Sequence, residues 1–144
     1  MTQALVVDTS VFIKWYRQHE EDAAAALALR DAYLTGEILL VEPDVALYEF
    51  ANVMRYMDEL NTEQVQLAVE SLFAFPIRWV QPTWQLMERA VAIAREHDKV
   101  TVYDAVFAAV AEAYDTLFVT ADLRFVRVAP DLSYVRPLAG FRLP

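Results

Sequence analysis

Four acidic residues occupy positions where a carboxylate needs a partner. Asp8 and Asp122 each follow a short apolar stretch that is predicted to form a strand. Asp104 lies in the first turn of a segment that is otherwise apolar on every side, and Glu49 borders the apolar stripe of another segment. A buried carboxylate requires a cation, a hydrogen-bond donor or a raised pKa, because leaving it charged and unpaired is costly. These four acids are therefore candidates for one shared site.

Nearby basic residues do not account for these acids. There is no Lys or Arg between residues 31 and 54, around Glu49, and none between residues 100 and 115, around Asp104. A shared divalent cation is the better explanation, and oxygen ligands without thiolates or clustered histidines suit Mg²⁺ or Mn²⁺. The two histidines, His19 in a polar turn and His97 near a helix end, are expected at the surface.

Each acid also has a purely structural explanation. Asp8 could cap the helix that follows it, and Asp104 could belong to a capping box with Thr101. Asp122 could be an ordinary turn residue, and Glu49 could lie at the border between the core and solvent. Capping and metal binding are compatible, because a helix N-terminus favours an ionised carboxylate. The four acids together are harder to explain in this way than any one of them.

Composition limits the possible classes of protein. The chain has 144 residues, of which 57% are hydrophobic, and we expect one globular domain over residues 1–144. The absence of cysteine excludes disulfides, thiolate nucleophiles and Cys-bound zinc. Glycine occurs only at Gly36 and Gly140, which removes P-loop NTPases and Rossmann oxidoreductases from consideration.

The charge balance and hydropathy indicate the surroundings in which the protein acts. The formal net charge of −9 argues against general binding of nucleic acid, so metal ions or a local basic patch would have to offset the acids. No segment is long and apolar enough to cross a membrane. The first apolar run stops at Asp8 and has no basic region before it, unlike a signal peptide. We therefore expect a cytoplasmic protein without membrane contact.

Short apolar strands alternate with helices along the chain. Strands are expected near residues 4–7, 38–41, 77–80, 116–120 and 134–136. Helices are expected near residues 11–17, 20–35, 44–60, 61–75, 83–97, 101–114 and 123–128. Ser10 is predicted to cap the first helix, and Asn61 with Gln64 to form a capping box on the fourth. The alternation predicts an α/β sandwich with a mainly parallel sheet, whose first strand delivers Asp8 to the carboxyl edge.

Four short segments that carry the acids resemble the acidic signatures of PIN-domain ribonucleases. In order and spacing they resemble the VapC toxins of bacterial and archaeal toxin–antitoxin pairs, and the likeness covers residues 5–125. The segments are Val7-Asp8-Thr9-Ser10, Tyr48-Glu49-Phe50-Ala51-Asn52-Val53, Val102-Tyr103-Asp104-Ala105 and Val119-Thr120-Ala121-Asp122, followed by Phe125. The resemblance implies a PIN-like three-layer α/β/α sandwich whose acids meet at one edge of the sheet.

The resemblance also implies an activity, the endonucleolytic cleavage of RNA that depends on Mg²⁺ or Mn²⁺, with one or two ions bound. The catalytic and metal-binding residues would be Asp8, Glu49, Asp104 and Asp122. Nearby polar support would come from Thr9, Ser10 and Thr120. Metal held by these carboxylates would lower the pKa of a bound water and neutralise charge on the reacting phosphate.

Basic and aromatic residues near the acids indicate possible partners. Four basic residues could rim the site and hold the RNA backbone, although such residues on short helices are often only solvated: Lys14, Arg17, Arg124 and Arg127. The resemblance implies a cognate VapB-like antitoxin that blocks the acidic centre with a helix or an extended arm. Phe12, Trp15, Tyr16 and the Ala-rich second helix could line its groove. The family likeness also implies a homodimer.

Two other classes of function compete with a nuclease. One is a PIN-fold interaction module that has lost catalysis, although the presence of all four acids argues against it. The other is a metal-dependent phosphatase or a receiver-like phosphate switch with carboxylates at the same sheet edge. A receiver needs a pair of acids near its first strand, and Val6-Val7 does not supply one.

Overall fold

The computed structural model describes residues 2–144, and five short strands form one sheet at its centre. In chain order these are β1 (Gln3–Val7), β2 (Ile38–Pro43), β3 (Arg78–Val80), β4 (Leu117–Thr120) and β5 (Val135–Pro137). Their order across the sheet is β3-β2-β1-β4-β5, and all neighbouring strands are parallel. The chain builds outward from β1 first on one side and then on the other. The strand order therefore reverses between β1 and β4, the position where open α/β sheets place their sites.

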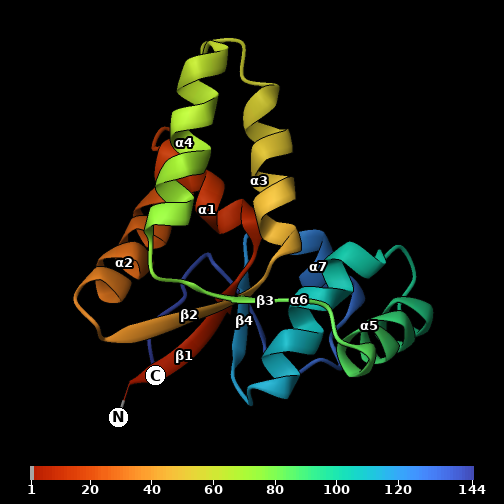
Figure 1. The fold of residues 1–144 in the computed structure, drawn as a ribbon. Helices are drawn as coiled ribbons and strands as arrows, with labels where there is room; N and C mark the ends of the chain where they lie inside the picture. The colour runs from red at the N-terminus through yellow and green to blue at the C-terminus, as the bar shows by residue number, and fades with distance from the viewer. Residues whose placement is uncertain (1) are drawn as a thin grey trace.

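Helices flank the sheet. They are α1 (Thr9–Tyr16), α2 (Ala23–Leu34), α3 (Val45–Arg55), α4 (Thr62–Ala74), α5 (Trp84–Glu96), α6 (Val102–Ala113) and α7 (Leu123–Val128). Helices α1, α2 and α6 pack against the strands, and α5 packs against α6. Figure 1 shows α3 and α4 side by side as a hairpin that rises above the sheet. This arrangement confirms the predicted PIN-like α/β/α sandwich with a parallel sheet.

The core forms around the central strand. Leu5, Val6 and Val7 of β1 have no exposed area, because helices cover both faces of this strand. Burial of each such side chain contributes roughly 1.5–3 kcal/mol to stability. Half of α6 is buried as well, between Ala105 and Ala111, while Tyr103 in its first turn is exposed. The ring of Phe118 in β4 lies 5.7 Å from that of Phe107 and stacks on it, which joins α6 to the sheet. None of the helices within residues 2–144 combines the length and apolarity needed to span a membrane.

Three helices differ from their predicted bounds by two residues or more. Helix α2 begins at Ala23 rather than at residue 20, because Asp22 before it has a left-handed backbone conformation with φ of 61°. Helix α1 begins at Thr9, two residues early, so Asp8 takes the N-cap position and the prediction that Ser10 caps this helix is wrong. The Ser10 hydroxyl turns back to donate to the Asp8 carboxylate instead. Helix α3 ends at Arg55, before the predicted residue 60, because the amides of Tyr56 and Met57 turn back to carbonyls three residues earlier.

The fourth helix begins as its sequence predicts. The Asn61 side chain accepts a hydrogen bond from the Gln64 amide at 2.8 Å, and the Gln64 side chain accepts one from the Asn61 amide at 2.8 Å. This confirms the capping box. Reciprocal bonds of this kind satisfy amides that the first turn of a helix leaves unpaired.

The prediction that His97 lies at the surface is wrong, because its exposed fraction is 6%. Its Nδ1 lies 2.7 Å from the Ile93 carbonyl oxygen, and its Nε2 lies 2.7 Å from a carboxylate oxygen of Asp131. Both partners are acceptors, so both ring nitrogens donate when the ring is a charged imidazolium. The bond to Ile93 and, after it, the Asp131 carboxylate raise the pKa of His97 above its ordinary value of 6.5.

We predict that His97→Gln lowers the free energy of unfolding more in mild acid than in mild base. A raised pKa in the folded state stabilises the protein below the unfolded pKa, and this stabilisation is lost as the pH rises through the folded pKa. Urea unfolding of the wild type and the variant from about pH 5 to about pH 9 measures the difference. Asp131→Asn is the matched control, because it keeps the shape of the partner but removes its charge and should weaken the pH dependence. An equal cost of His97→Gln at both ends of the range would contradict the assignment.

Candidate active site

Asp8 lies at the reversal of strand order, where β1 ends and α1 begins. Its amide donates to the carbonyl of Val119 in β4 at 2.8 Å, so its backbone is tied to the neighbouring strand. Its Oδ2 accepts hydrogen bonds from the Ser10 hydroxyl at 2.7 Å and from the Thr120 hydroxyl at 3.1 Å. The two hydroxyls come from different elements. Together they fix the direction of the Asp8 carboxylate.

The same hydroxyls connect the acid to the loop that follows β4. The Ser10 hydroxyl oxygen accepts from the Ala121 amide at 3.2 Å, and the Thr120 hydroxyl oxygen accepts from the Asp122 amide at 3.0 Å. Each hydroxyl thus donates to Asp8 while it accepts from a backbone amide. The structure therefore places both Ser10 and Thr120 beside the acids, as the sequence predicts for polar support.

Glu49 reaches this region from α3. Its Oε1 accepts a hydrogen bond from the Thr9 hydroxyl at 2.8 Å. Asp8, Glu49 and Asp104 line one open cavity of about 360 Å³, together with Thr9 and Ser10. Three elements distant in sequence, the end of β1, α3 and the first turn of α6, thus bring three of the predicted acids together.

Burial and mutual repulsion disturb the ionisation of these acids. Burial raises the pKa of Asp8, the hydrogen bonds from Ser10 and Thr120 oppose this, and the charge of Asp104 raises it further. Burial raises the pKa of Glu49 from 4.5 to about 7, and the charges of Asp8 and Asp104 add to the effect against the hydrogen bond from Thr9. These carboxylates are short of positive charge, so a bound cation would stabilise them.

Asp122 has a different environment. It does not line the cavity, and its Oδ1 caps α7 by accepting from the amides of Arg124 at 3.0 Å and Phe125 at 3.2 Å. The Arg124 guanidinium lies between two acids, 3.3 Å from Asp122 Oδ2 and 3.4 Å from Asp104 Oδ2. It also donates to the Lys99 carbonyl at 2.6 Å. The sequence shows no basic residue near Asp104 along the chain, and the structure supplies it with an arginine that is distant in sequence.

The donor set has the chemistry of a site for a hard divalent cation. Apart from the Lys14 ammonium, the polar side-chain atoms that line the cavity are carboxylate and hydroxyl oxygens, and burial, with mutual repulsion added to it, raises the pKa of Asp8 and Glu49. In their present orientations, however, no three Asp, Glu or His side chains within residues 2–144 could hold a metal ion. Asp104 is turned toward Arg124. A metal that recruits Asp104 must therefore compete with this arginine.

The predicted basic residues divide into two groups. Lys14 lines the cavity, with 12% of its side chain exposed, and pairs with Glu20 at 3.3 Å. Arg124 contacts the acids directly. Arg17 pairs instead with Glu20 at 3.5 Å and with Glu59 at 3.4 Å, outside the set of residues that lines the cavity. Arg127 is exposed on α7.

Two of the aromatic residues that were predicted to line an antitoxin groove do not lie at the surface. Phe12 is fully buried and Trp15 is 4% exposed, and their rings contact each other edge to face at 4.9 Å. They are therefore part of the core and do not line a groove. Tyr16 is half-buried, and its hydroxyl is hydrogen-bonded to Ser71 of α4.

Two acids near the site were missed by sequence analysis. Glu20 lines the cavity beside Lys14, and nothing in its polar sequence surroundings distinguishes it from a solvated residue. Glu42 is fully buried at the end of β2. The criterion that selected Asp8, an acid that interrupts an apolar strand, applies to Glu42 as well and could have identified it.

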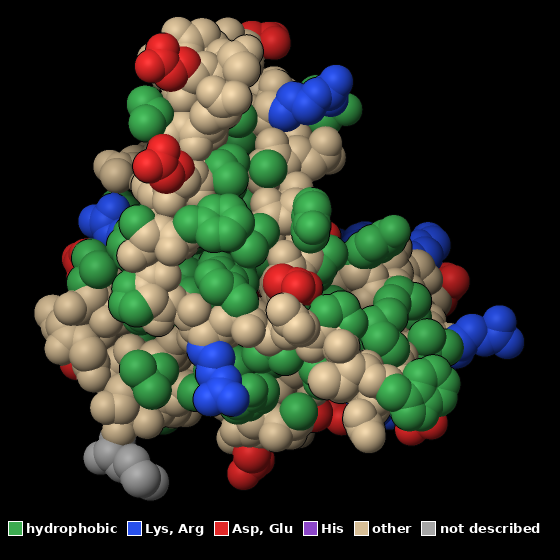
Figure 2. Space-filling model, in the orientation of Figure 1, with side chains coloured by type: hydrophobic (Ala, Val, Ile, Leu, Met, Phe, Trp, Pro, Cys, Tyr) green, Lys and Arg blue, Asp and Glu red, His purple; other side chains and the backbone are tan. Residues whose placement is uncertain are grey.

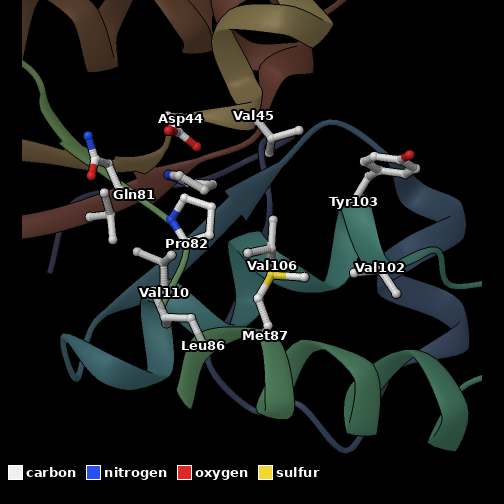
Figure 3. Close-up of a pocket in the computed structure, with 12 residues that line it drawn as sticks. Asp44, Val45, Gln81, Pro82, Leu86, Met87, Val102, Tyr103, Val106 and Val110 are labelled. Carbon is white, nitrogen blue, oxygen red and sulfur yellow. The ribbon is translucent and has the colours of Figure 1, made fainter. Parts of the chain in front are cut away.

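A second hollow is apolar. Figure 3 shows side chains from the end of β3, α5 and α6 around it, among them Pro82, Leu86, Met87, Val106 and Val110. Exposed aromatic residues lie nearby in sequence, with Tyr48 77% and Tyr103 65% exposed. Figure 2 shows apolar side chains gathered over this face of the molecule. The hollow offers mainly apolar contact area, although Asp44 and Tyr103 also line it.

We predict that Glu49→Gln raises the free energy of unfolding of the metal-free protein near pH 8 and has little effect near pH 4. The folded-state pKa of about 7 lies above the ordinary 4.5, so the folded state loses stability as the pH rises between these values. The gain should be roughly 1–3 kcal/mol at about pH 8, after allowance for solvent screening. Urea unfolding measures it, with the exposed Glu70→Gln as the matched control. A variant no more stable than the wild type in mild base would refute the raised pKa of Glu49 and the burial that is its main cause.

Solved structures of other proteins resemble the fold of this chain. A DNA-bound VapBC from Salmonella typhimurium has a TM-score of 0.69 at 19% identity, over 96% of this chain and 99% of that chain. VapBC2 from Rickettsia felis, bound to a promoter fragment, has a TM-score of 0.68 at 15% identity, over 94% and 98% of the two chains. VapC20 from Mycobacterium tuberculosis, a toxin that cleaves the sarcin-ricin loop, has a TM-score of 0.64 at 15% identity, over 81% and 87%.

At these identities the likeness shows a common fold. A comparison with curated proteins gave no significant match. Residues 5–130, which include all four predicted acids, match the PIN domain family. The chain therefore belongs to the PIN domain family.

Proposed function

We propose that this protein is an endoribonuclease that depends on Mg²⁺ or Mn²⁺ and acts as the toxin of a VapBC-like pair. The observation that carries the proposal is the convergence of Asp8, Glu49 and Asp104 on one cavity at the β1–β4 reversal. Membership of the PIN domain family and the folds of the VapBC neighbours support the same conclusion. The cleavage of an RNA loop by the M. tuberculosis neighbour supports RNA as the substrate.

In this proposal three of the acids share one role and Asp122 has another. Asp8, Glu49 and Asp104 would hold the cation, which would supply an activated water and neutralise charge on the phosphate. Ser10 and Thr120 orient Asp8, and Thr9 holds Glu49 Oε1, which leaves Oε2 to bind the cation. The cation would lower the pKa of Glu49 from the value of about 7 that it has in the metal-free site and keep its carboxylate ionised. Asp122 would act on Asp104 through Arg124 and through the start of α7.

Basic residues would guide the RNA backbone. Lys14 at the cavity and the exposed Arg127 on α7 are placed to meet phosphates. Arg124 would contribute when it leaves Asp104. Arg17 is directed to Glu20 and Glu59, so it carries less of this role.

Two protein partners belong to the same proposal. The VapBC and FitAB neighbours are toxin–antitoxin complexes, which supports a cognate antitoxin that covers the acidic cavity. The net charge of −9 favours a basic segment in that antitoxin. The homodimer stays a prediction, and the apolar hollow beside Tyr103 is a surface suited to it.

The test is cleavage of a mixed cellular RNA pool by purified protein freed of any partner. We expect discrete fragments with Mg²⁺ or Mn²⁺ and none with EDTA, because the carboxylates need the cation. Asp8→Asn should lower the rate roughly 100-fold or more, the scale of a lost metal-holding or proton-transfer group. Sequencing of the fragment ends would identify the target.

Asp31→Asn is the matched control for this experiment, since it makes the same chemical change on a side chain that is 68% exposed on α2. It should cleave like the wild type. Folded, partner-free protein that leaves the pool intact with both metals would contradict the proposal and favour an inactive interaction module. Cleavage that Asp8→Asn retains would assign the activity to a contaminant.

We predict that Arg124→Ala and Arg127→Ala flatten the salt dependence of RNA binding, measured in the Asp8→Asn background to prevent cleavage. Each lost phosphate contact should reduce the slope of log affinity against log salt by about 0.7 for single-stranded RNA. Arg30→Ala on α2, whose side chain pairs with Asp31, is the control and should leave the slope unchanged. An unchanged slope in both variants would reject the role of these arginines.

A further inference from the structure

Glu42 is a buried acid with an incomplete set of partners. It lies at the end of β2 with no exposed area. Its Oε1 accepts a hydrogen bond from the Val7 amide at 2.7 Å. Its Oε2 has no hydrogen-bond partner within residues 2–144. An apolar residue would fill this position without the cost of desolvating a carboxyl group, so the presence of Glu42 needs an explanation.

The hydrogen bond of Glu42 replaces a bond of the sheet. The β1–β2 ladder pairs Gln3 with Ile38, Ala4 with Leu39 and Leu5 with Leu40, and no pair follows. After the Leu5–Leu40 pair, the Val7 amide donates its hydrogen bond to the Glu42 side chain of β2 and not to a backbone carbonyl of that strand. The next amide along the chain, that of Asp8, donates to Val119 of β4. The two successive peptides that flank Val7 are therefore held on opposite sides, the first by Glu42 through the Val7 amide and the second by β4 through the Asp8 amide.

Burial and the absence of a basic partner among the described residues favour the neutral form of Glu42. No Lys, Arg or His forms an ion pair with it in the described part of the chain. Burial raises the pKa of Glu42 well above its ordinary value, the bond from Val7 opposes this, and the charge of Asp8 raises it further. A neutral carboxyl still offers a carbonyl oxygen to the Val7 amide. It does so without placing a second negative charge behind Asp8.

We propose that Glu42 is a positioning residue of the acidic site, which fixes the end of β1 through the Val7 amide and thereby directs the Asp8 carboxylate into the cavity. The inference rests on the proposed function, in that Asp8 is taken as a residue that holds the cation. It assigns Glu42 no contact with RNA or with the metal. Its contribution passes through one backbone hydrogen bond.

The test compares Glu42→Gln with Glu42→Leu, two side chains of similar size of which only Gln keeps an acceptor for Val7. Cleavage kinetics give kcat and KM, and calorimetric titration with Mn²⁺ gives the metal affinity without RNA. Glu42→Gln should match the wild type in all three. Glu42→Leu should lose roughly 10- to 100-fold in kcat, the scale of a misplaced reacting group, with KM unchanged and Mn²⁺ bound more weakly. Ile93→Val, a buried change in α5, is the control for a loss of stability alone and should alter neither kcat nor Mn²⁺ affinity.

The outcomes separate this proposal from the nuclease proposal. If the wild type cleaves no RNA, the nuclease proposal fails, and Mn²⁺ affinity alone decides the role of Glu42. Equal kcat and Mn²⁺ affinity in Glu42→Leu and the wild type would overturn the positioning role. A Gln variant as impaired as the Leu variant would also overturn it, because the negative charge rather than the acceptor would then be needed. If Glu42→Leu does not fold, Glu42→Asp, which shortens the side chain by one methylene, replaces it with the same expected losses.

Discussion

The constraint on which this structure depends is the partial burial of the Asp8 carboxylate at the end of the central strand, β1. Leu5, Val6 and Val7 must be apolar because β1 is covered on both faces, and the strand then delivers a carboxylate to the reversal of strand order. Burial opposes the charge of that carboxylate. The hydroxyls of Ser10 and Thr120 favour it. The first turn of α1 and the end of β4 together bring both hydroxyls to Asp8 Oδ2.

This arrangement explains why the end of β4 and the start of α1 are so closely connected. Ser10 contacts Asp8 because α1 starts at Thr9, which puts its hydroxyl within reach of the residue before the helix. Thr120 reaches the same oxygen because β4 is paired with β1 in register up to Val119. Each hydroxyl is oriented in turn by an amide of the loop after β4. A shift of either element by one residue would remove a hydroxyl from the carboxylate.

Sequence alone identified the parts of the site that depend on local pattern. Asp8 and Asp104 stand out because an acid interrupts an apolar segment, and both lie at the cavity. Sequence could not predict Arg124 as the partner of Asp104, because the ion pair joins two helices through the tertiary fold. The same limit applies to His97, whose burial depends on packing of the helix end and on Asp131 in a later loop. Phe12 and Trp15 show the reverse error, since aromatic residues beside a site were assigned to a groove and belong to the core.

The four acids are unequal in how their charge is balanced. Asp104 and Asp122 share the Arg124 guanidinium, and Asp122 also caps α7, so this outer pair is compensated within the chain. Asp8 and Glu49 instead accept hydrogen bonds from the neutral hydroxyls of Ser10, Thr120 and Thr9, and each has a raised pKa. A cation therefore gains most beside the inner pair, where desolvation strengthens its attraction to the carboxylates. Arg124 then becomes the group that any cation must displace to reach Asp104, and the balance between the two sets how readily the site assembles.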